Sequence, residues 1–263
     1  MRFYTGDATY DTLLAAALVF AVGVFIISWF LPSPYGRFAS GRFGVSVSPR
    51  LGWLLMELPA TLSFLYFYFQ GPKRGETVPL LFLAMWCLHY ANRGFFFPLA
   101  LRVARGERGS FSALVIITGW GVTSLHGYFH ATYFTRLGHY STDWLGDPRF
   151  LCGFAIYYTA LALNIHSDAI LRNLRSPAEV AAGTKVYRIP RGGLFRWVSS
   201  PSYLTELIAW AGFALCTYSL AGVFIFLVSA ANLVPRAFAT HRWYRARFPD
   251  YPSSRRALVP FLL

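Results

Sequence analysis

Residues 201–236 read PSYLTELIAWAGFALCTYSLAGVFIFLVSAANLVPR, and this stretch decides the fold class. It holds two apolar runs, at 203–217 and 219–236, which are separated only by Thr217, Tyr218 and Ser219. A helix that crosses the hydrocarbon core of a bilayer needs about 20 mostly apolar residues. The stretch therefore predicts two membrane helices that are joined in a tight hairpin.

Further apolar runs precede the hairpin. They lie at 11–31, 52–70, 78–101, 111–134 and 150–167. The 263-residue chain is 56% hydrophobic and 13% charged, whereas soluble domains carry about 25% charged residues. We therefore expect an all-α integral membrane protein with seven transmembrane helices, folded as a single domain over residues 1–263.

The basic residues are distributed unequally between the two sides of this predicted bundle. One side carries eighteen of them: Arg37, Arg42, Arg50, Arg102, Arg105, Arg108, Arg172, Arg175, Lys185, Arg188, Arg191, Arg196, Arg236, Arg242, Arg245, Arg247, Arg255 and Arg256. The other side carries five: Arg2, Lys73, Arg74, Arg136 and Arg149. Because cytoplasmic loops carry an excess of lysine and arginine, we expect a cytoplasmic C-terminus and an N-terminus outside. The net charge of +13 then reports orientation and not a nucleic-acid partner.

The sequence lacks the common motifs of soluble enzymes. No GxGxxG, HExxH, GxSxG or P-loop occurs, so a Rossmann domain is unsupported. Cys87, Cys152 and Cys216 each fall in an apolar run without a CxxC pair, which argues against a disulfide framework or a zinc site. His126 and His130 share a helix face but have no evident third ligand, so we expect no metal and interpret both as satisfied polar side chains.

A few polar residues fall within predicted spans, where such groups are costly and are commonly functional. Glu57, Tyr90, Arg93 and Glu206 belong to this group. A tyrosine hydroxyl that is supported by a carboxyl group can polarise a substrate carbonyl in a dry site. A polar clamp between helices is an alternative interpretation of Glu57 that the sequence leaves open.

A second polar group is expected where the fifth span ends. Asn164, Asp168, Arg172 and Arg175 recur at spacings of four and three residues and form one stripe on a helix. Arginine pairs bind phosphate oxygens in a bidentate fashion, although a solvated helix end with an Asp–Arg pair has the same pattern. The tail HRWYRARFPDYPSSRRAL, at 241–258, mixes basic and aromatic side chains and could also bind anionic lipid.

With these residues the chain resembles the steroid 5α-reductase family over nearly its whole length. The most specific motifs are NIHSD at 164–168 and YRIPRGGLF at 187–195. The other matching elements are Tyr35-Gly36-Arg37, Trp53 with Glu57-Leu58-Pro59, Leu88-His89-Tyr90 with Arg93, Tyr203 with Glu206, and Arg236 with His241-Arg242-Trp243-Tyr244. The chain departs from the family at Ser202, where the family often has asparagine, and at Ala239-Thr240, where it has further histidines.

The resemblance implies a seven-helix membrane enzyme that uses NADPH to reduce the 4,5 double bond of a 3-oxo-Δ4-steroid. By resemblance, Glu57 and Tyr90 are catalytic and contact the 3-oxo oxygen, and Trp53 lines the steroid pocket. The loop 168–202 and the tail 237–263 would contribute to the cofactor site. The residues implied to contact the cofactor are Tyr35, Arg93, Asn164, Asp168, Arg175, Arg188, Ser202, Glu206, Arg236, His241 and Tyr244.

Other functions remain open from the residues alone. They are a related membrane reductase of an isoprenoid or enoyl lipid, an enzyme like the isoprenylcysteine methyltransferases, and a sterol-binding protein without catalysis. We expect a hydrophobic enone and membrane lipid as partners, and a monomer. The composition, rich in alanine and arginine, favours a bacterial homologue in the inner membrane, whereas a eukaryotic protein would reside in the endoplasmic reticulum.

Overall fold

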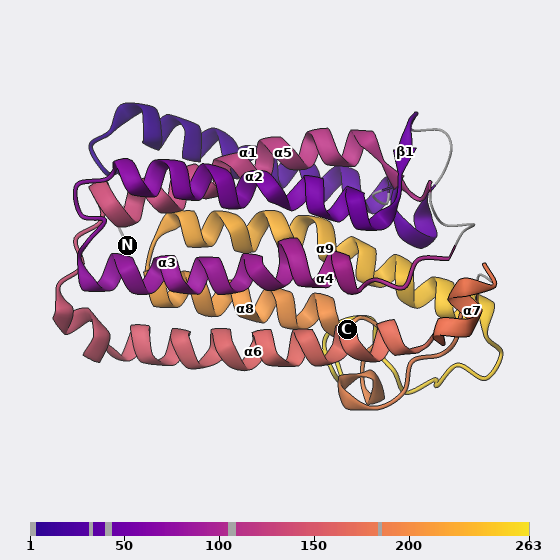
Figure 1. Cartoon of the computed structure of the whole chain (residues 1–263). Helices are drawn as coiled ribbons and strands as arrows, with labels where there is room; N and C mark the ends of the chain where they lie inside the picture. The colour runs from indigo at the N-terminus through magenta and orange to yellow at the C-terminus, as the bar shows by residue number, and fades with distance from the viewer. Residues whose placement is uncertain (1–3, 32–33, 40–43, 105–108, 184–185, 263) are drawn as a thin grey trace.

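The computed structural model describes residues 4–31, 34–39, 44–104, 109–183 and 186–262. Over these ranges the chain forms a bundle of long helices that run side by side along one axis (Figure 1). Five residues that enter the charge asymmetry lie outside the described residues, namely Arg2, Arg42, Arg105, Arg108 and Lys185.

Within the described ranges, seven stretches are helical over several turns. They are α1 (Ala8–Phe30), α2 (Pro49–Gln70), α3 (Thr77–Tyr90) with a π-helical segment (Ala91–Phe96) and α4 (Phe97–Ala100), α5 (Ala113–Thr132) with a π-helical segment (Tyr133–Leu137), α6 (Pro148–Asn173), α8 (Pro201–Thr217) and α9 (Leu220–Arg247). The shorter elements are 3-10 turns at Gly36–Phe38, Thr142–Gly146 and Gly193–Arg196, the helix α7 (Pro177–Ala181), and the strands β1 (Ser46–Val47) and β2 (Phe111–Ser112).

Each predicted apolar run falls on one of these helical stretches. Among the described residues, four helices are long and apolar enough to cross a membrane, namely α1, α2, α6 and α9. The α3 helix has only 14 residues before its π-helical segment, and α8 has 17. The mostly helical membrane fold is therefore confirmed, whereas seven crossings and the orientation of the termini stay predictions.

Two features differ from the expectation. A two-stranded antiparallel sheet pairs Ser46 with Ser112 and Val47 with Phe111, so the all-α prediction is wrong at this point. In addition, α6 and α9 continue well beyond their apolar runs. The extension of α9 is stabilised by packing, because Arg236, Ala237, Thr240 and Tyr244 are buried at helical spacing on one face.

The hairpin of α8 and α9 forms as expected. Tyr218 adopts a left-handed backbone conformation with φ 45° at the turn, and the Ser219 hydroxyl caps α9 by accepting from the Gly222 N–H at 3.1 Å. The next helix pair, α6 and α8, crosses closely at two glycines. A Cβ on Gly153 would lie 2.4 Å from the Cys216 nitrogen, and a Cβ on Gly212 would lie 2.7 Å from the Tyr157 nitrogen. Glycine therefore sets the spacing of these two helices.

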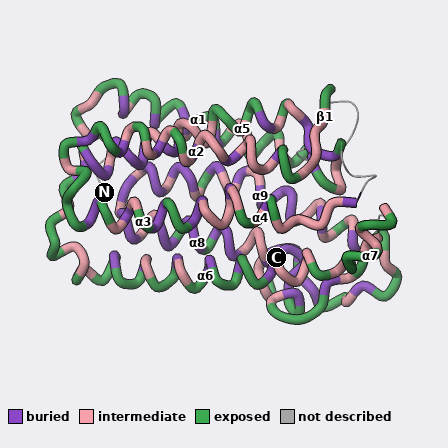
Figure 2. The backbone as a smooth tube through the Cα atoms, viewed as in Figure 1, coloured by how far each residue is buried: buried purple, intermediate pink, exposed green. Residues whose placement is uncertain are grey.

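The burial pattern fits a bundle that is surrounded by lipid. Buried residues lie on the inner faces of the helices, and exposed residues follow the outer faces of α1 and α6 (Figure 2). The exposed side chains of α1 include large apolar ones such as Val19, Ile26 and Phe30. The strand β1, the helix α7 and the end of α9 all lie at one end of the bundle, which we call the α7 end (Figure 1).

Candidate active site

Two cavities lie within the bundle and share one wall. The apolar cavity has a volume of about 370 Å³ and the basic cavity a volume of about 290 Å³. Five residues line both cavities, namely Tyr35, Trp53, Arg93, Glu206 and Leu233. Both volumes are of the order of cavities that bind small molecules, about 300–1,000 Å³. A molecule in one cavity can therefore approach a molecule in the other across this wall.

The apolar cavity is lined by side chains of α1, α2, α3, α5, α8 and α9, and most of the surface that they present to it is apolar. The lining includes Phe20, Val24, Met56, Val122, Ile225 and Val228. Glu57 and Tyr90 also line it, and both are buried; their contact with a substrate stays a prediction. Such a cavity suits a rigid apolar ligand that carries one polar group for Glu57 and Tyr90 to recognise.

Arg93 lies in the shared wall and is held by charge and by aromatic rings. Its Nε lies 3.8 Å from Glu57 Oε1, and its guanidinium carbon lies 4.4 Å above the Trp53 ring centre and 4.9 Å above that of Phe97. It belongs to the π-helical segment Ala91–Phe96, which begins directly after Tyr90. Segments of this kind recur at functional sites, and here the segment connects two residues of the apolar cavity.

A hydrogen-bonded network between α6 and α8 forms part of the same wall. The Asn164 amide donates to the Ser202 carbonyl at 2.8 Å and to Glu206 Oε2 at 3.2 Å. Trp210 Nε1 donates to the other oxygen of Glu206 at 2.9 Å. The Ser202 hydroxyl donates to Asp168 Oδ1 at 2.6 Å. Serine at position 202 therefore has a partner of its own on the adjacent helix.

The basic cavity is lined by many more cations than anions. Its arginines are Arg37, Arg93, Arg102, Arg172, Arg175 and Arg188, and its carboxyl groups are those of Asp168 and Glu206. Tyr35, Tyr187, Tyr203, Tyr244 and Ser202 also belong to the polar lining. This balance favours an anionic ligand with flat ring systems, because arginine binds phosphate oxygens and tyrosine stacks on rings.

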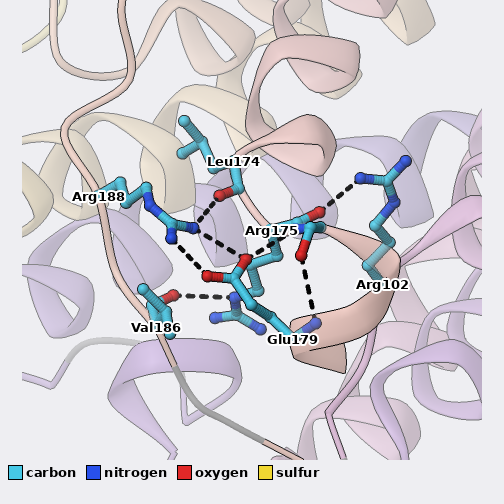
Figure 3. A network of polar contacts seen from close by, with 7 residues as sticks. Arg102, Leu174, Arg175, Glu179, Val186 and Arg188 are labelled. Atoms are coloured by element: carbon cyan, nitrogen blue, oxygen red, sulfur yellow. Dashed lines mark hydrogen bonds and ion pairs between the residues drawn. The ribbon is translucent and has the colours of Figure 1, made fainter. Parts of the chain in front are cut away.

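A polar network fixes the arginines at the α7 end (Figure 3). Arg188 Nη1 donates to the Leu174 carbonyl at 2.5 Å and to Glu179 Oε2 at 3.1 Å, while Arg175 Nε donates to the Val186 carbonyl at 3.0 Å. The Arg188 guanidinium, with the Ser176 backbone N–H, lowers the pKa of Glu179 to about 2. Segments 174–179 and 186–188 are thereby held together beside the cavity.

Arg37 is a candidate ligand-binding residue that the sequence analysis did not assign to the cofactor site. Its Nη1 atom is buried and has no hydrogen-bond partner among the described residues, and its side chain lines the basic cavity. Its guanidinium carbon lies 4.6 Å from the Trp243 ring centre and 4.8 Å from that of Tyr244. A buried donor that is left unpaired is costly, so an anionic ligand fits here. The Tyr35-Gly36-Arg37 motif was the only sequence signal.

Most residues that the resemblance implies are brought together. Trp53, Glu57 and Tyr90 line the apolar cavity. Those that line the basic cavity are Tyr35, Arg93, Asp168, Arg175, Arg188, Ser202, Glu206 and Tyr244.

Three predicted cofactor residues, Asn164, Arg236 and His241, line neither cavity. Asn164 supports Glu206 through the network described above. Arg236 Nη2 donates to the Tyr35 carbonyl at 3.1 Å and its guanidinium stacks 3.7 Å from the Tyr35 ring centre. His241 Nδ1 lies 2.6 Å from the Ser199 hydroxyl, which also contacts Tyr251. In this structure all three position other residues, and direct contacts with a cofactor stay predictions.

In the part of the chain that the structure describes, no group of three or more histidine, cysteine, aspartate or glutamate side chains is placed to hold a metal ion.

Two adjoining cavities inside a membrane bundle, one lined by Glu57 and Tyr90 and the other by arginines, indicate a membrane-embedded enzyme. Comparison with known proteins assigns the family. The family model for 3-oxo-5-alpha-steroid 4-dehydrogenase matches residues 110–263. The chain belongs to this family of oxidoreductases of steroid metabolism.

Similar proteins cover nearly the whole chain. The 3-oxo-5-alpha-steroid 4-dehydrogenase 1 of Rattus norvegicus is 39% identical over 235 residues, which are 88% of this chain and 86% of the rat protein. The steroid 5-alpha-reductase DET2 of Solanum lycopersicum is 35% identical over 262 residues, 99% of each chain. The Homo sapiens 3-oxo-5-alpha-steroid 4-dehydrogenase 1 is 34% identical, with 98% of this chain and 99% of the human protein covered. These relatives are eukaryotic, so they give no support to the expectation of a bacterial source.

Proposed function

We propose that the protein reduces the 4,5 double bond of a 3-oxo-Δ4-steroid to a 5α-3-oxosteroid, with NADPH as the reductant. One observation carries the proposal. An apolar cavity that ends on Glu57 and Tyr90 meets an arginine-rich cavity across a wall that includes Arg93 and Glu206. Family membership supports the steroid, and the basic lining supports a dinucleotide with a phosphate on its ribose.

The residues present fit the dinucleotide. The unpaired Nη1 of Arg37 and the guanidinium groups of Arg102 and Arg172 would bind phosphate oxygens, while Tyr187 and Tyr244 offer faces for ring stacking. Asp168 and Glu206 would accept hydrogen bonds from ribose hydroxyl or carboxamide groups. When bound, NADPH provides the hydride that is added to the substrate carbon C5.

Glu57 and Tyr90 stabilise the charge that develops on the substrate. As C5 gains a hydride, negative charge moves to the 3-oxo oxygen, and a hydroxyl donor is the group that stabilises it best in a dry cavity. Tyr90 is that donor, and Glu57 from the same cavity supports it. Trp53 packs against Arg93 at the boundary and closes the side of the steroid pocket. Protonation at C4 then completes the saturated ketone.

We also propose how the chain lies in the membrane. The helical stretches cross it seven times as one domain, with the C-terminus in the cytoplasm and the N-terminus outside. The asymmetry of basic residues supports this orientation. Four of the arginines assigned to the cytoplasm, Arg236, Arg242, Arg245 and Arg247, belong to the end of α9, which lies at the α7 end (Figure 1). The segment 168–202 and the tail 237–263 then flank the cofactor site, and the complete site within one chain supports a monomer.

The test is a product assay on purified protein with NADPH and progesterone or testosterone, read by mass spectrometry with the stereochemistry at C5. We expect a 5α product from the wild type, and losses of about 10²-fold or more in kcat for Glu57→Gln and for Tyr90→Phe. Binding of NADPH should survive in both variants. The matched controls Glu76→Gln and Tyr66→Phe change exposed residues and should leave turnover unchanged.

The other functions predict different results in the same assay. Normal turnover in Glu57→Gln and Tyr90→Phe would show that Glu57 and Tyr90 do not have the catalytic roles assigned to them. NADPH binding without a steroid product would favour a related reductase of an isoprenoid or enoyl lipid. Binding of S-adenosylmethionine in place of NADPH would favour a methyltransferase, and binding of sterol with neither nucleotide would favour a protein without catalysis.

A further inference from the structure

Behind Tyr90 lies a cluster of buried polar side chains that the proposed function does not use. It consists of Trp86 and His89 on α3, His126 and His130 on α5, and Tyr157 on α6, and we call it the histidine cluster. Each of these side chains is at most 2% exposed. Seven of their polar atoms have no hydrogen-bond partner in the described part of the chain: Trp86 Nε1, both ring nitrogens of His89 and of His126, His130 Nε2 and the Tyr157 hydroxyl.

These residues form one connected group. The ring centre of His126 lies 4.4 Å from that of Trp86 and 4.5 Å from that of His130, and Trp86 and His130 are 5.3 Å apart. The His89 ring lies 6.1 Å from the Tyr157 ring. The two sets meet at Trp210, whose ring centre lies 4.4 Å from that of His89 and 5.3 Å from that of His126.

Protein side chains alone do not satisfy this cluster. His130 Nδ1 lies 2.8 Å from the His126 carbonyl oxygen, so Nδ1 carries the hydrogen and Nε2 is left as an acceptor. Trp86 Nε1 is only a donor, and each neutral imidazole of His89 and His126 has one donor and one acceptor. Leaving a buried donor or acceptor unsatisfied is costly, and native proteins satisfy such groups with ordered water.

The cluster opens toward the catalytic residues and is closed behind. His89 and His126 both line the apolar cavity, and their rings lie 5.2 Å and 6.1 Å from the Tyr90 ring. At the far side, the rings of Phe134 and Phe213 pack 5.5 Å and 5.4 Å from His130, and both are nearly inaccessible. Water or a proton therefore reaches the cluster from the side of the cavities.

Glu206 connects the cluster with the basic cavity. His89 Nε2 lies 3.7 Å from Glu206 Oε1, a distance that a direct hydrogen bond does not span but that one bridging water does. Glu206 also lines the basic cavity, which lies toward the charged residues of the α7 end. Polar groups thus run from the basic cavity through Glu206 to His89, and the rings of His89 and His126 both pack against Trp210, at 4.4 Å and 5.3 Å between ring centres.

We propose that the histidine cluster holds ordered water and acts as the proton relay for the reaction, with His89 and His126 as its working residues. This inference rests on the proposed function. After hydride has been added to C5, the C4–H bond forms and an O–H bond of a relay water breaks. The hydroxide left behind takes a proton that enters from bulk water by way of Glu206 and His89, so one proton is consumed in each turnover. C4 is bonded to the carbonyl carbon, which places it near the residues that flank Tyr90.

The proposal is tested with His89→Gln and His126→Gln. Glutamine keeps hydrogen-bonding atoms but does not pass a proton from one side to the other as imidazole does. We expect kcat to fall by about 10²-fold, the KM for the steroid and the Kd for NADPH to change less than about twofold, and the solvent deuterium isotope effect on kcat to increase. The matched control is His139→Gln, an exposed residue in contact with Lys73, for which all values should stay at those of the wild type.

A purely structural role gives a different pattern. It predicts a lower melting temperature with an unchanged isotope effect and an unchanged kcat in the protein that remains folded, and this result would overturn the relay. The His126→Gln variant carries the test if His89→Gln does not fold. Absence of turnover in the wild type would count against the reductase function itself, and not specifically against the relay.

Two measurements need no variant. Turnover of the wild type in mixtures of H₂O and D₂O should depend on the deuterium fraction along a curve, because several protons move in a relay, and a straight line would contradict it. An experimental structure that resolves water should show density between His126, His130 and Trp86. A dry cluster would refute the proposal whatever the enzyme's activity.

Discussion

Arg93 is the cation that several buried carboxyl groups share, and this predicts an asymmetry between two substitutions. Its electrostatic partners are Glu206, Glu57 and Asp168. Glu57→Gln leaves Arg93 with two other carboxyl groups. Arg93→Met leaves all three carboxyl groups without this cation. We therefore expect Arg93→Met to destabilise the fold much more than Glu57→Gln does.

The magnitude follows from the geometry of the pair. With an effective dielectric constant of about 20, two unit charges at the 3.8 Å between Arg93 Nε and Glu57 Oε1 attract by about 4 kcal/mol. Removing one partner of a buried pair costs about 3–5 kcal/mol in measured cases. For a chain of this size, 1 kcal/mol corresponds to about 2–4 °C in melting temperature. Arg93→Met should therefore lower the melting temperature by about 10 °C, and Glu57→Gln by less than half of that.

The assay is thermal unfolding in one detergent at one scan rate, followed by tryptophan fluorescence. Arg93→Lys is the control for charge, since it keeps the cation but loses the planar packing over Trp53 and Phe97, and it should fall between the wild type and Arg93→Met. The double variant Glu57→Gln/Arg93→Met should lose less than the sum of the single losses. Equal losses in the two single variants would refute the idea of a shared cation.

Two further predictions concern the frame of the site. Gly153→Ala should lower the melting temperature by several degrees, since its Cβ would meet backbone atoms of α8 and overpacking costs about 1–3 kcal/mol. The control Gly121→Ala has open space around the new Cβ and should leave the melting temperature unchanged. An unchanged melting temperature in Gly153→Ala would contradict the close crossing of α6 and α8. The pKa of Glu179 is lowered to about 2 by Arg188, so the stability that this pair contributes is complete above pH 4.5 and is lost as the pH falls through about 2. NMR of a ¹³C-labelled glutamate carboxyl should follow this titration, Arg188→Met should shift it upward, and a wild-type midpoint near 4.5 would contradict the pairing.

The positions of the helices could be predicted from the sequence because the hydrophobicity of each run is a local property. The ends of α6 and α9 could not, because they depend on packing. Arg236 and Tyr244 are polar enough to suggest a solvated tail, yet both are buried on the inner face of α9. The pairing of Ser46 with Ser112 was also beyond reach, since nothing in two segments of two residues each marks them as partners.

Part of the candidate site could be predicted from the sequence, because a charged residue in an apolar run is costly to bury and therefore stands out. Glu57 and Arg93 stand out in apolar runs, and the structure pairs them. Arg37 lies in a loop, where an arginine is ordinary, and only the fold shows that one of its nitrogens is buried without a partner. The interpretation of His126 and His130 as satisfied side chains is wrong for three of their four ring nitrogens, because satisfaction depends on neighbours from other helices.

The polarity of the interior decreases with distance from the basic cavity. Charged groups come first, neutral polar groups next and apolar rings last, which is the order of decreasing desolvation cost. Partly exposed arginines such as Arg102, Arg172 and Arg188 line the basic cavity. Arg93 in the shared wall and Glu57 in the apolar cavity compensate each other's charge and keep 18% and 10% of their side chains exposed. Behind Tyr90 the polar groups are neutral, as in His126, and the cluster ends on the apolar ring of Phe213. An ion costs more to bury than a dipole, and a dipole more than a ring. Tyr90 lies between the compensated ions and the neutral groups that are able to pass a proton. A neutral enone develops charge only in its transition state, so this position suits its carbonyl group.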